Sequence, residues 1–188
     1  MTISVTPIHF QDDAQLLTQA GFKTSNTWYH GTSSGLVASI LNKGLLPSGD
    51  RESIQRTKKA MITIGDSFKE NKDPIFLTQS KELAYFWATK CAQSRGQLFS
   101  TTEEPAVLSI TLTDDLNSNV KTDVGAAALL MGSAEEYLEV INQVYTAKGL
   151  ATPEVDPVTA DRMDYLNLLG MAYSKQSIAP QYIKTVEA

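Results

Sequence analysis

The sequence predicts one domain that mixes short strands with helices, and three patterns lead to this prediction. Residues 28–33 (WYHGTS) pass from β-favouring aromatics into a glycine and two hydroxyls, which is typical of a strand that ends in a turn. Residues 106–112 alternate as a strand does, whereas residues 80–91 and 133–145 carry apolar side chains at helical spacing. A chain of 188 residues is long enough to bury one hydrophobic core.

The composition excludes several classes of protein. The net charge of −5 argues against a general nucleic-acid binder. The single cysteine, Cys91, excludes internal disulfides and Cys-rich metal sites, and two histidines are too few for a His-based zinc site. Neither a signal peptide nor a membrane span is recognisable. We therefore expect a soluble protein without a metal, either cytoplasmic or exported into a target cell without a classical signal peptide.

Two helices are predicted on either side of the strand at residues 28–33. Residues 12–20 form a short amphipathic pattern, which one of the two aspartates at its start would cap. Residues 36–41 have apolar side chains at helical spacing, and Thr32 or Ser33 can cap this helix. Gly44 suits its C-terminal cap.

Residues 47–73 differ sharply in composition, because charged side chains crowd this stretch. We interpret it as a solvated loop, with a mobile lid over a site as the functional alternative. A few apolar residues within it (Met61, Ile62 and Ile64) suggest one strand.

A buried strand and a long helix are expected next. Residues 74–78 form the strand, and Ser80 can cap the helix. Leu83, Trp87 and Cys91 share one face of this helix, which we assign to the core.

The last third of the chain is predicted to be largely helical. Residues 114–119 have turn chemistry, 125–131 form a packed turn of helix, and 133–136 are a capping box that opens a helix. Residues 159–169 suit either a helix or a helix running into a strand, and 182–186 a terminal strand. The buried stripe of the helix after the capping box is expected at Tyr137, Leu138, Ile141, Val144 and Tyr145.

The order of five segments is distinctive, although no phosphate-binding loop, dinucleotide fingerprint or nucleophile elbow is present. The segments are Tyr29-His30-Gly31-Thr32 and residues 40–47, 75–78, 80–88 and 106–112. Their order resembles the ADP-ribosyltransferase superfamily, in particular the diphtheria-toxin and poly(ADP-ribose) polymerase branch with its His-Tyr-Glu signature. The similarity covers residues 28–112, with weaker echoes at 178–186.

The resemblance implies an α+β fold with a split β-sheet and flanking helices, in which the nicotinamide half of NAD lies between the halves of the sheet. It implies a single domain over residues 1–188, with residues 113–170 as a helical insertion. The expected function is that of a mono-ADP-ribosyltransferase, a toxin-like or effector-like glycosyltransferase. It would transfer ADP-ribose from NAD, as substrate, to a protein or other macromolecular acceptor and release nicotinamide.

Site residues follow from the resemblance position by position. His30 matches the first signature residue, whose imidazole hydrogen-bonds the adenosine-side ribose, and Gly31 the position whose backbone holds the carboxamide. From its chemistry alone, a histidine in such a turn is more often a capping or packing residue. Phe76 falls near the signature tyrosine, and Phe86, or less closely Tyr85, near the second aromatic that sandwiches the nicotinamide ring.

The signature glutamate has no counterpart, because the matching place falls on Leu169, Gly170 or Met171. Glu135 is the remaining candidate carboxylate, and without the signature acid we expect transfer of single units. The predicted catalytic residues are His30, Phe76 and Glu135, and the predicted NAD-binding residues are Tyr29, His30, Gly31, Thr32, Ser33, Phe76, Ser80, Tyr85 and Phe86.

Two other functions compete with this one. An inactive module would keep the cleft and bind a partner or nucleotide without turnover, which the missing glutamate favours. The RNA 2′-phosphotransferases share the implied fold and the His-Gly-Thr turn, but they need several cations around the phosphate. The four arginines (Arg51, Arg56, Arg95 and Arg162) do not lie beside the signature turns in the sequence. We therefore expect NAD and a protein acceptor as partners, without a membrane or a nucleic acid.

Overall fold

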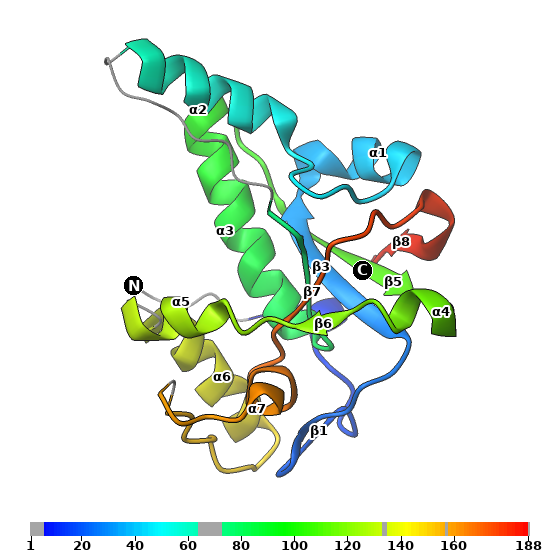
Figure 1. The fold of residues 1–188 in the computed structure, drawn as a ribbon, viewed down its shortest axis with the longest axis vertical. Helices are drawn as coiled ribbons and strands as arrows, with labels where there is room; N and C mark the ends of the chain where they lie inside the picture. Colours follow the sequence, from blue (N-terminus) through cyan, green and yellow to red (C-terminus); the bar gives the residue numbers. More distant parts are fainter. Residues whose placement is uncertain (1–5, 64–72, 133–134, 157, 188) are drawn as a thin grey trace.

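The computed structural model describes residues 6–63, 73–132, 135–156 and 158–187, and it combines helices with small antiparallel sheets (Figure 1). The helices are α1 (Ser34–Lys43), α2 (Arg51–Thr63), α3 (Lys81–Phe99), α4 (Asp114–Asn117), α5 (Ala126–Gly132), α6 (Glu135–Ala147) and α7 (Arg162–Asn167), with 3-10 turns η1 (Ile8–Phe10) and η2 (Pro180–Tyr182). The strands are β1 (Leu17–Thr18), β2 (Gly21–Phe22), β3 (Thr27–Ser33), β4 (Ile75–Leu77), β5 (Pro105–Thr111), β6 (Lys121–Thr122), β7 (Ala172–Ser174) and β8 (Ile183–Thr185).

Two three-stranded sheets, in the orders β3-β5-β8 and β4-β7-β6, form the centre of the molecule. They meet at an antiparallel bridge, where the Tyr29 N–H donates to the Thr78 carbonyl at 2.7 Å and the Thr78 N–H donates back at 3.0 Å. Continued in register, this pairing would bring Gly31 opposite Phe76. In the described residues the ladder does not continue there, so β3 and β4 part beyond Tyr29.

Helix α3 covers the sheet formed by β3 and β5, and it approaches β3 very closely. A Cβ atom on Gly31 would lie 2.0 Å from the carbonyl oxygen of Ala84 and 2.6 Å from the amide nitrogen of Ala88. Both alanines are fully buried, and only small side chains allow two backbones to come so near. Figure 1 shows α1 and α2 above the sheets, α6 and α7 below them, and α5 level with β6.

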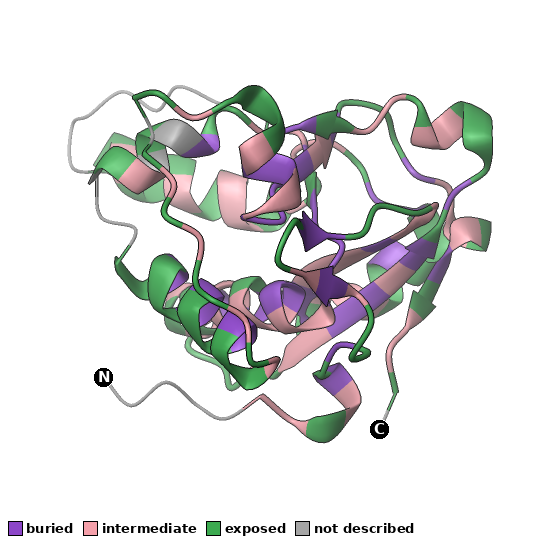
Figure 2. Cartoon of the chain, turned by 90° about the horizontal axis from the view of Figure 1, so that it is seen from below, coloured by how far each residue is buried: buried purple, intermediate pink, exposed green. Residues whose placement is uncertain are grey.

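The core lies along the strands and the inner sides of the helices, as the buried residues in Figure 2 show. One cluster includes Trp28, Leu77 and Ile110 from the two sheets, and a second joins Leu83 of α3 to α6 and to Leu169. Burying apolar side chains of this size stabilises the fold by roughly 1.5–3 kcal/mol each.

Several local predictions are confirmed. The strands predicted within residues 74–78 and 182–186 are β4 and β8, and those predicted at 28–33 and 106–112 match β3 and β5 to within one residue at each end. The side chain of Ser33 accepts the Gly35 N–H at the start of α1, that of Ser80 accepts the Leu83 N–H at the start of α3, and Gly44 caps the end of α1.

The helix predicted at residues 12–20 is wrong, because this segment holds β1 of a small hairpin. Leu17 and Phe22 pack into the core instead. The side chain of Asp12 accepts hydrogen bonds from the Ser80 hydroxyl and, at 2.6 Å, from the Lys81 N–H. The aspartate therefore caps α3, a helix almost seventy residues away, which the local sequence does not reveal.

The loop predicted at residues 47–73 is wrong for residues 51–63, which form α2, and Met61 and Ile62 lie in this helix instead of a strand. The helix has no buried residue; its half-buried side chains, Ser53, Ile54, Thr57 and Met61, share one face, but only two of them are apolar, so the helical period is hard to recognise. Its arginine, lysine, glutamate and alanine residues are good helix formers. Ile64 and the rest of residues 64–72 lie outside the described residues, and the lid stays a prediction.

Smaller differences occur after β5. Residues 114–117 form the one-turn helix α4, and Asn117 accepts a hydrogen bond from the Trp28 indole at 2.6 Å. Residues 113–170 also supply β6, a strand, besides their helices. In α6 the buried stripe includes Val140, whereas Leu138 is exposed. Ser133 and Ala134 of the predicted capping box lie outside the described residues.

Asp12 makes the stability of the fold depend on pH. Burial raises the pKa of Asp12 from 3.8 to about 6, against the hydrogen bonds from Ser80 and Lys81. The stabilisation that the protonated group gives is complete below pH 3.8 and is lost as the pH rises through about 6. Relative to Asp12→Asn, the free energy of unfolding of the wild type should fall by about 2 kcal/mol from pH 4 to pH 7.5.

Urea unfolding of both proteins at several pH values measures this difference, and Asp13→Asn controls for the change in net charge at an exposed neighbour. The asparagine keeps an acceptor for the Lys81 N–H. Parallel curves for the wild type and Asp12→Asn would show that the carboxyl group does not titrate in the folded protein.

Candidate functional site

A cavity of about 780 Å³, which we call the cleft cavity, opens where β3 and β4 part. Its lining includes His30 and Gly31 of β3, Phe76 of β4, Trp87 of α3 and Met171 next to β7. The volume lies within the range of about 300–1,000 Å³ typical of small-molecule sites. The split between the sheets therefore creates a space for a ligand of moderate size.

His30 is oriented by β4. Its Nδ1 lies 2.8 Å from the carbonyl oxygen of Phe76. Since a carbonyl only accepts, Nδ1 carries the proton and donates it, which leaves Nε2 as an acceptor in the neutral ring. Burial lowers the pKa of His30 despite this hydrogen bond, so the imidazole is neutral at pH 7. The ring can thus accept a hydrogen bond from a ligand hydroxyl.

The peptide groups of Gly31 point towards the cleft cavity. Neighbouring residues of a strand direct their N–H and C=O groups to opposite edges, so Gly31 faces the same edge as Tyr29, which binds Thr78. At the other edge of β3, Val107 of β5 lies opposite Gly31. The Val107 carbonyl accepts a hydrogen bond from the Val186 N–H, so it faces away from β3 and does not bind Gly31. A donor and an acceptor of the backbone are therefore presented to the cavity.

Two aromatic side chains of this lining are unusually accessible. Phe76 is 50% exposed and Trp87 is 37% exposed. Phe76 was expected here, whereas the two candidates for the second aromatic lie elsewhere: Tyr85 stacks on Phe10 with ring centroids 4.9 Å apart, and Phe86 packs edge-on against Tyr137 at 5.6 Å. Sequence reasoning missed Trp87 because its helix face was assigned to the core. The available signal was the face shared by Leu83, Trp87 and Cys91, whose outer part lines the cavity.

Two charged side chains also line the cleft cavity. Lys90 of α3 forms an ion pair with Glu136 of α6. Asp123, directly after β6, accepts a hydrogen bond from the Gly125 N–H at 3.0 Å. Burial raises the pKa of Asp123, although backbone hydrogen bonds from Gly125 and Ala126 oppose this effect. Sequence reasoning named neither residue.

A second cavity of about 840 Å³, the α1 cavity, adjoins the first and is lined by residues of α1, α2 and the same strands. His30, Gly31, Phe76 and Cys91 line both cavities. Ligand groups bound in the two cavities would meet at His30 and Phe76. The α1 cavity is more polar, with side chains that include Thr32, Ser39, Lys43, Asp50 and Arg95.

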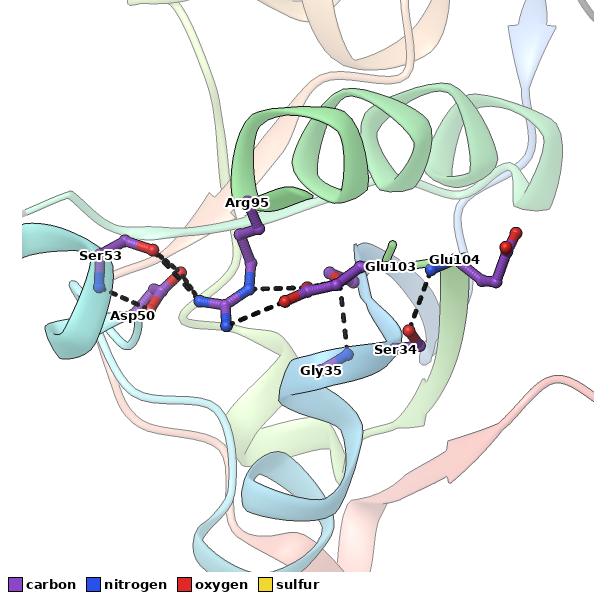
Figure 3. Close-up of polar contacts among 8 residues, drawn as sticks. Ser34, Gly35, Asp50, Ser53, Arg95, Glu103 and Glu104 are labelled. Atoms are coloured by element: carbon purple, nitrogen blue, oxygen red, sulfur yellow. Dashed lines mark hydrogen bonds and ion pairs between the residues drawn. The ribbon is translucent and has the colours of Figure 1, made fainter. Parts of the chain in front are cut away.

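The guanidinium of Arg95 holds a charged cluster in the α1 cavity (Figure 3). It contacts Asp50 and Ser53 on one side and Glu103 on the other, with 2.9 Å between Nε and a Glu103 carboxylate oxygen. The Ser33 hydroxyl also donates to Glu103. The structure thus brings an arginine beside the signature turn, which the sequence did not predict, and two carboxylates neutralise its charge.

The remaining predicted site residues do not line the cleft cavity. Thr32 lines the α1 cavity. Ser33 and Ser80 are buried helix caps, and Ser80 is hydrogen-bonded to Asp12. Glu135 is exposed at the start of α6. Of the places that match the missing glutamate, Leu169 is buried and its carbonyl accepts a hydrogen bond from Tyr137, whereas Gly170 and Met171 line the cavity.

Comparison with known proteins adds no relative to this picture: no family model, no curated protein and no solved structure matches the chain. Across residues 6–63, 73–132, 135–156 and 158–187, no helix is long and apolar enough to cross a membrane. The same residues contain no group of three or more His, Cys, Asp or Glu side chains that could hold a metal ion. The proposed function is therefore based on the two cavities.

Proposed function

We propose that this protein is an ADP-ribosyltransferase-like enzyme that transfers a single ADP-ribose unit from NAD to a protein acceptor. The observation that carries the proposal is the cleft cavity between two antiparallel sheets, with a neutral histidine and a glycine backbone on β3 facing two accessible aromatics. The split of the sheets between β3 and β4 supports the ADP-ribosyltransferase-like fold that the sequence resembles.

NAD would span both cavities. The nicotinamide ring would stack on Phe76 or Trp87 in the cleft cavity, with its carboxamide on the peptide groups of Gly31. The ADP half would extend into the more polar α1 cavity, where Ser39 and Lys43 offer a hydroxyl and a cation. His30 lines both cavities, and its Nε2 can accept a hydrogen bond from a ribose hydroxyl.

In the reaction, the bond between ribose C1′ and the nicotinamide nitrogen breaks. Its electron pair leaves with nicotinamide, which becomes neutral. A nucleophilic oxygen or nitrogen of the acceptor forms the new bond to C1′ and loses a proton to solvent; with water as acceptor the products are ADP-ribose, nicotinamide and a proton. The protein contributes positioning and stabilisation of positive charge on the ribose.

An inactive binding module is the second candidate. Its specific support is the absence of an acid at residues 169–171, of which Gly170 and Met171 line the cavity. A phosphotransferase finds less support, since two carboxylates pair with Arg95, the arginine that the structure brings beside the signature turn. Incubation with NAD and detection of free nicotinamide by mass spectrometry separates an enzyme from a binding module.

Calorimetric titration tests the proposed site. The wild type is expected to bind NAD saturably, and His30→Ala to weaken binding by about 1–2 kcal/mol through the lost hydrogen bond to ribose. His9→Ala, which replaces the other histidine, is the matched control and should bind like the wild type. Absence of binding to the wild type at millimolar NAD would refute the proposal.

A further inference from the structure

We propose that Asp123 is the catalytic carboxylate of the cleft cavity. It would accept hydrogen bonds from the hydroxyls of the ribose next to nicotinamide and stabilise the positive charge that develops at C1′ as nicotinamide leaves. This inference rests on the proposed function and names the acid that the chain lacks at its expected place.

Asp123 directly follows β6, which pairs with β7 in the second sheet. Thr122 of β6 lies opposite Ala172 of β7, and the Asp123 N–H donates to the Met171 carbonyl at 3.0 Å. The same register therefore brings Asp123 opposite Met171. The resemblance assigns the missing glutamate to residues 169–171, so an acid from the neighbouring strand lies beside that place.

The residues that line the cleft cavity also favour Asp123 as its carboxylate. In the part of the chain that the structure describes, Asp123 is the acidic side chain that lines the cleft cavity, and no other one does. It shares this lining with His30, Phe76 and Trp87, on which the binding of NAD is proposed to depend. Glu135, the acid selected from the sequence, is exposed on α6 and does not line the cavity.

The carboxyl group of Asp123 is held in place and still has acceptor sites for a ligand. One oxygen accepts the Gly125 N–H at 3.0 Å, so the backbone holds the side chain in place. A carboxylate offers about four acceptor sites, which leaves capacity for ribose hydroxyls. A negative charge fixed in a half-buried site stabilises a developing positive charge more strongly than one in water.

Asp123 also supports the turn that leads into α5, and the test must separate this role from catalysis. In Asp123→Asn the amide oxygen still accepts the Gly125 N–H, while the negative charge is lost. Asp123→Ser offers a hydroxyl oxygen as acceptor for the Gly125 N–H, and this variant is used if Asp123→Asn does not fold. Asp115→Asn, at an exposed aspartate of α4, is the control for net charge.

The experiment measures the initial rate of nicotinamide release and, by calorimetry, the affinity for NAD. Asp123→Asn is expected to release nicotinamide at least about 100-fold more slowly than the wild type, the scale for loss of one transition-state contact. Its affinity should stay within about threefold, because the charge acts mainly in the transition state. Asp115→Asn should match the wild type in both.

Each outcome decides between the two proposals. A variant that keeps the wild-type rate overturns the role of Asp123 and leaves the proposed enzyme intact. A wild type that binds NAD but releases no nicotinamide also overturns the role of Asp123 and favours the inactive module. A wild type that neither binds NAD nor releases nicotinamide removes the proposed function and this inference together.

Discussion

Replacing Gly31 with alanine is expected to lower the free energy of unfolding by about 3 kcal/mol, the upper part of the range for overpacked cores. The new methyl group would lie 2.0 Å from the Ala84 carbonyl oxygen, which belongs to the backbone of α3 and cannot rotate away. Helix α3 must move from β3, although Ala84 and Ala88 of α3 share a hydrophobic cluster with Tyr29 of β3.

Gly149→Ala is the control for this prediction. A Cβ atom there meets nothing within 4 Å, but its φ of +70° still disfavours alanine by about 1 kcal/mol. Urea unfolding of the two variants compares a steric cost with a conformational one. If Gly31→Ala is no less stable than Gly149→Ala, the close approach of α3 to β3 is not tight enough to explain the glycine. We also expect Gly31→Ala to weaken NAD binding, because α3 carries Trp87.

Replacing Arg95 with methionine is expected to cost about 3 kcal/mol of stability, as when one partner of a buried ion pair is removed. The side chain of Arg95 is 8% exposed, and its loss leaves Asp50 and Glu103 close together without their cation. The cluster also joins α3 to the residues before α2 and before β5, so its loss loosens two connections.

Glu136→Gln provides the comparison, because it breaks the ion pair with Lys90 whose side chains are 40% and 52% exposed. Such an exposed pair contributes about 0–1 kcal/mol. Thermal or urea unfolding of both variants measures the contrast. Equal costs for Arg95→Met and Glu136→Gln would mean that water screens the Arg95 cluster as well.

The same cluster predicts a dependence on pH. Burial raises the pKa of Asp50, but hydrogen bonds from Ser53 and Arg95 outweigh it and hold the pKa below 3.8; the hydrogen bonds from Arg95 and Ser33 hold that of Glu103 below 4.5. Stabilisation by depressed carboxyl groups is present above these values and is lost as the pH falls through the folded-state pKa. The stability difference between the wild type and Arg95→Met should therefore shrink as the pH falls below 4.5.

Much of the local structure could be predicted because it depends on neighbours in the chain. A serine before a helix, as at Ser33 and Ser80, accepts an N–H of the first turn, and Gly44 ends α1 with a positive φ. Alternation over residues 106–112 identified β5 for the same reason. His30 and Phe76 were recognised from short motifs, and the structure brings them within hydrogen-bonding distance through the Phe76 carbonyl.

The charged helix α2 and the first hairpin mark where local reasoning failed. Helix α2 buries no residue, and only two of its half-buried side chains, Ile54 and Met61, are apolar, so its helical period is weak in the sequence. The hairpin depends on Leu17 and Phe22 packing against distant residues, and Asp12 serves α3 instead of its own segment. Tertiary contacts outweighed a weak local preference in both the hairpin and the cap.

By itself, the sequence determined strands β3, β4, β5 and β8 and the caps of α1 and α3, because each of these depends on backbone preferences and hydrogen bonds within a few residues; the turn predicted at Gly31–Ser33 is the end of β3 instead. Only the tertiary structure decided which side chains face the cavities. Asp123 meets Met171 across two strands, Trp87 of α3 lines the cleft cavity, and Arg95 joins Asp50 to Glu103. Asp123 and Met171 are 48 residues apart, and Arg95 is 45 residues from Asp50 and 8 from Glu103. No periodicity of the chain encodes which of these residues will meet.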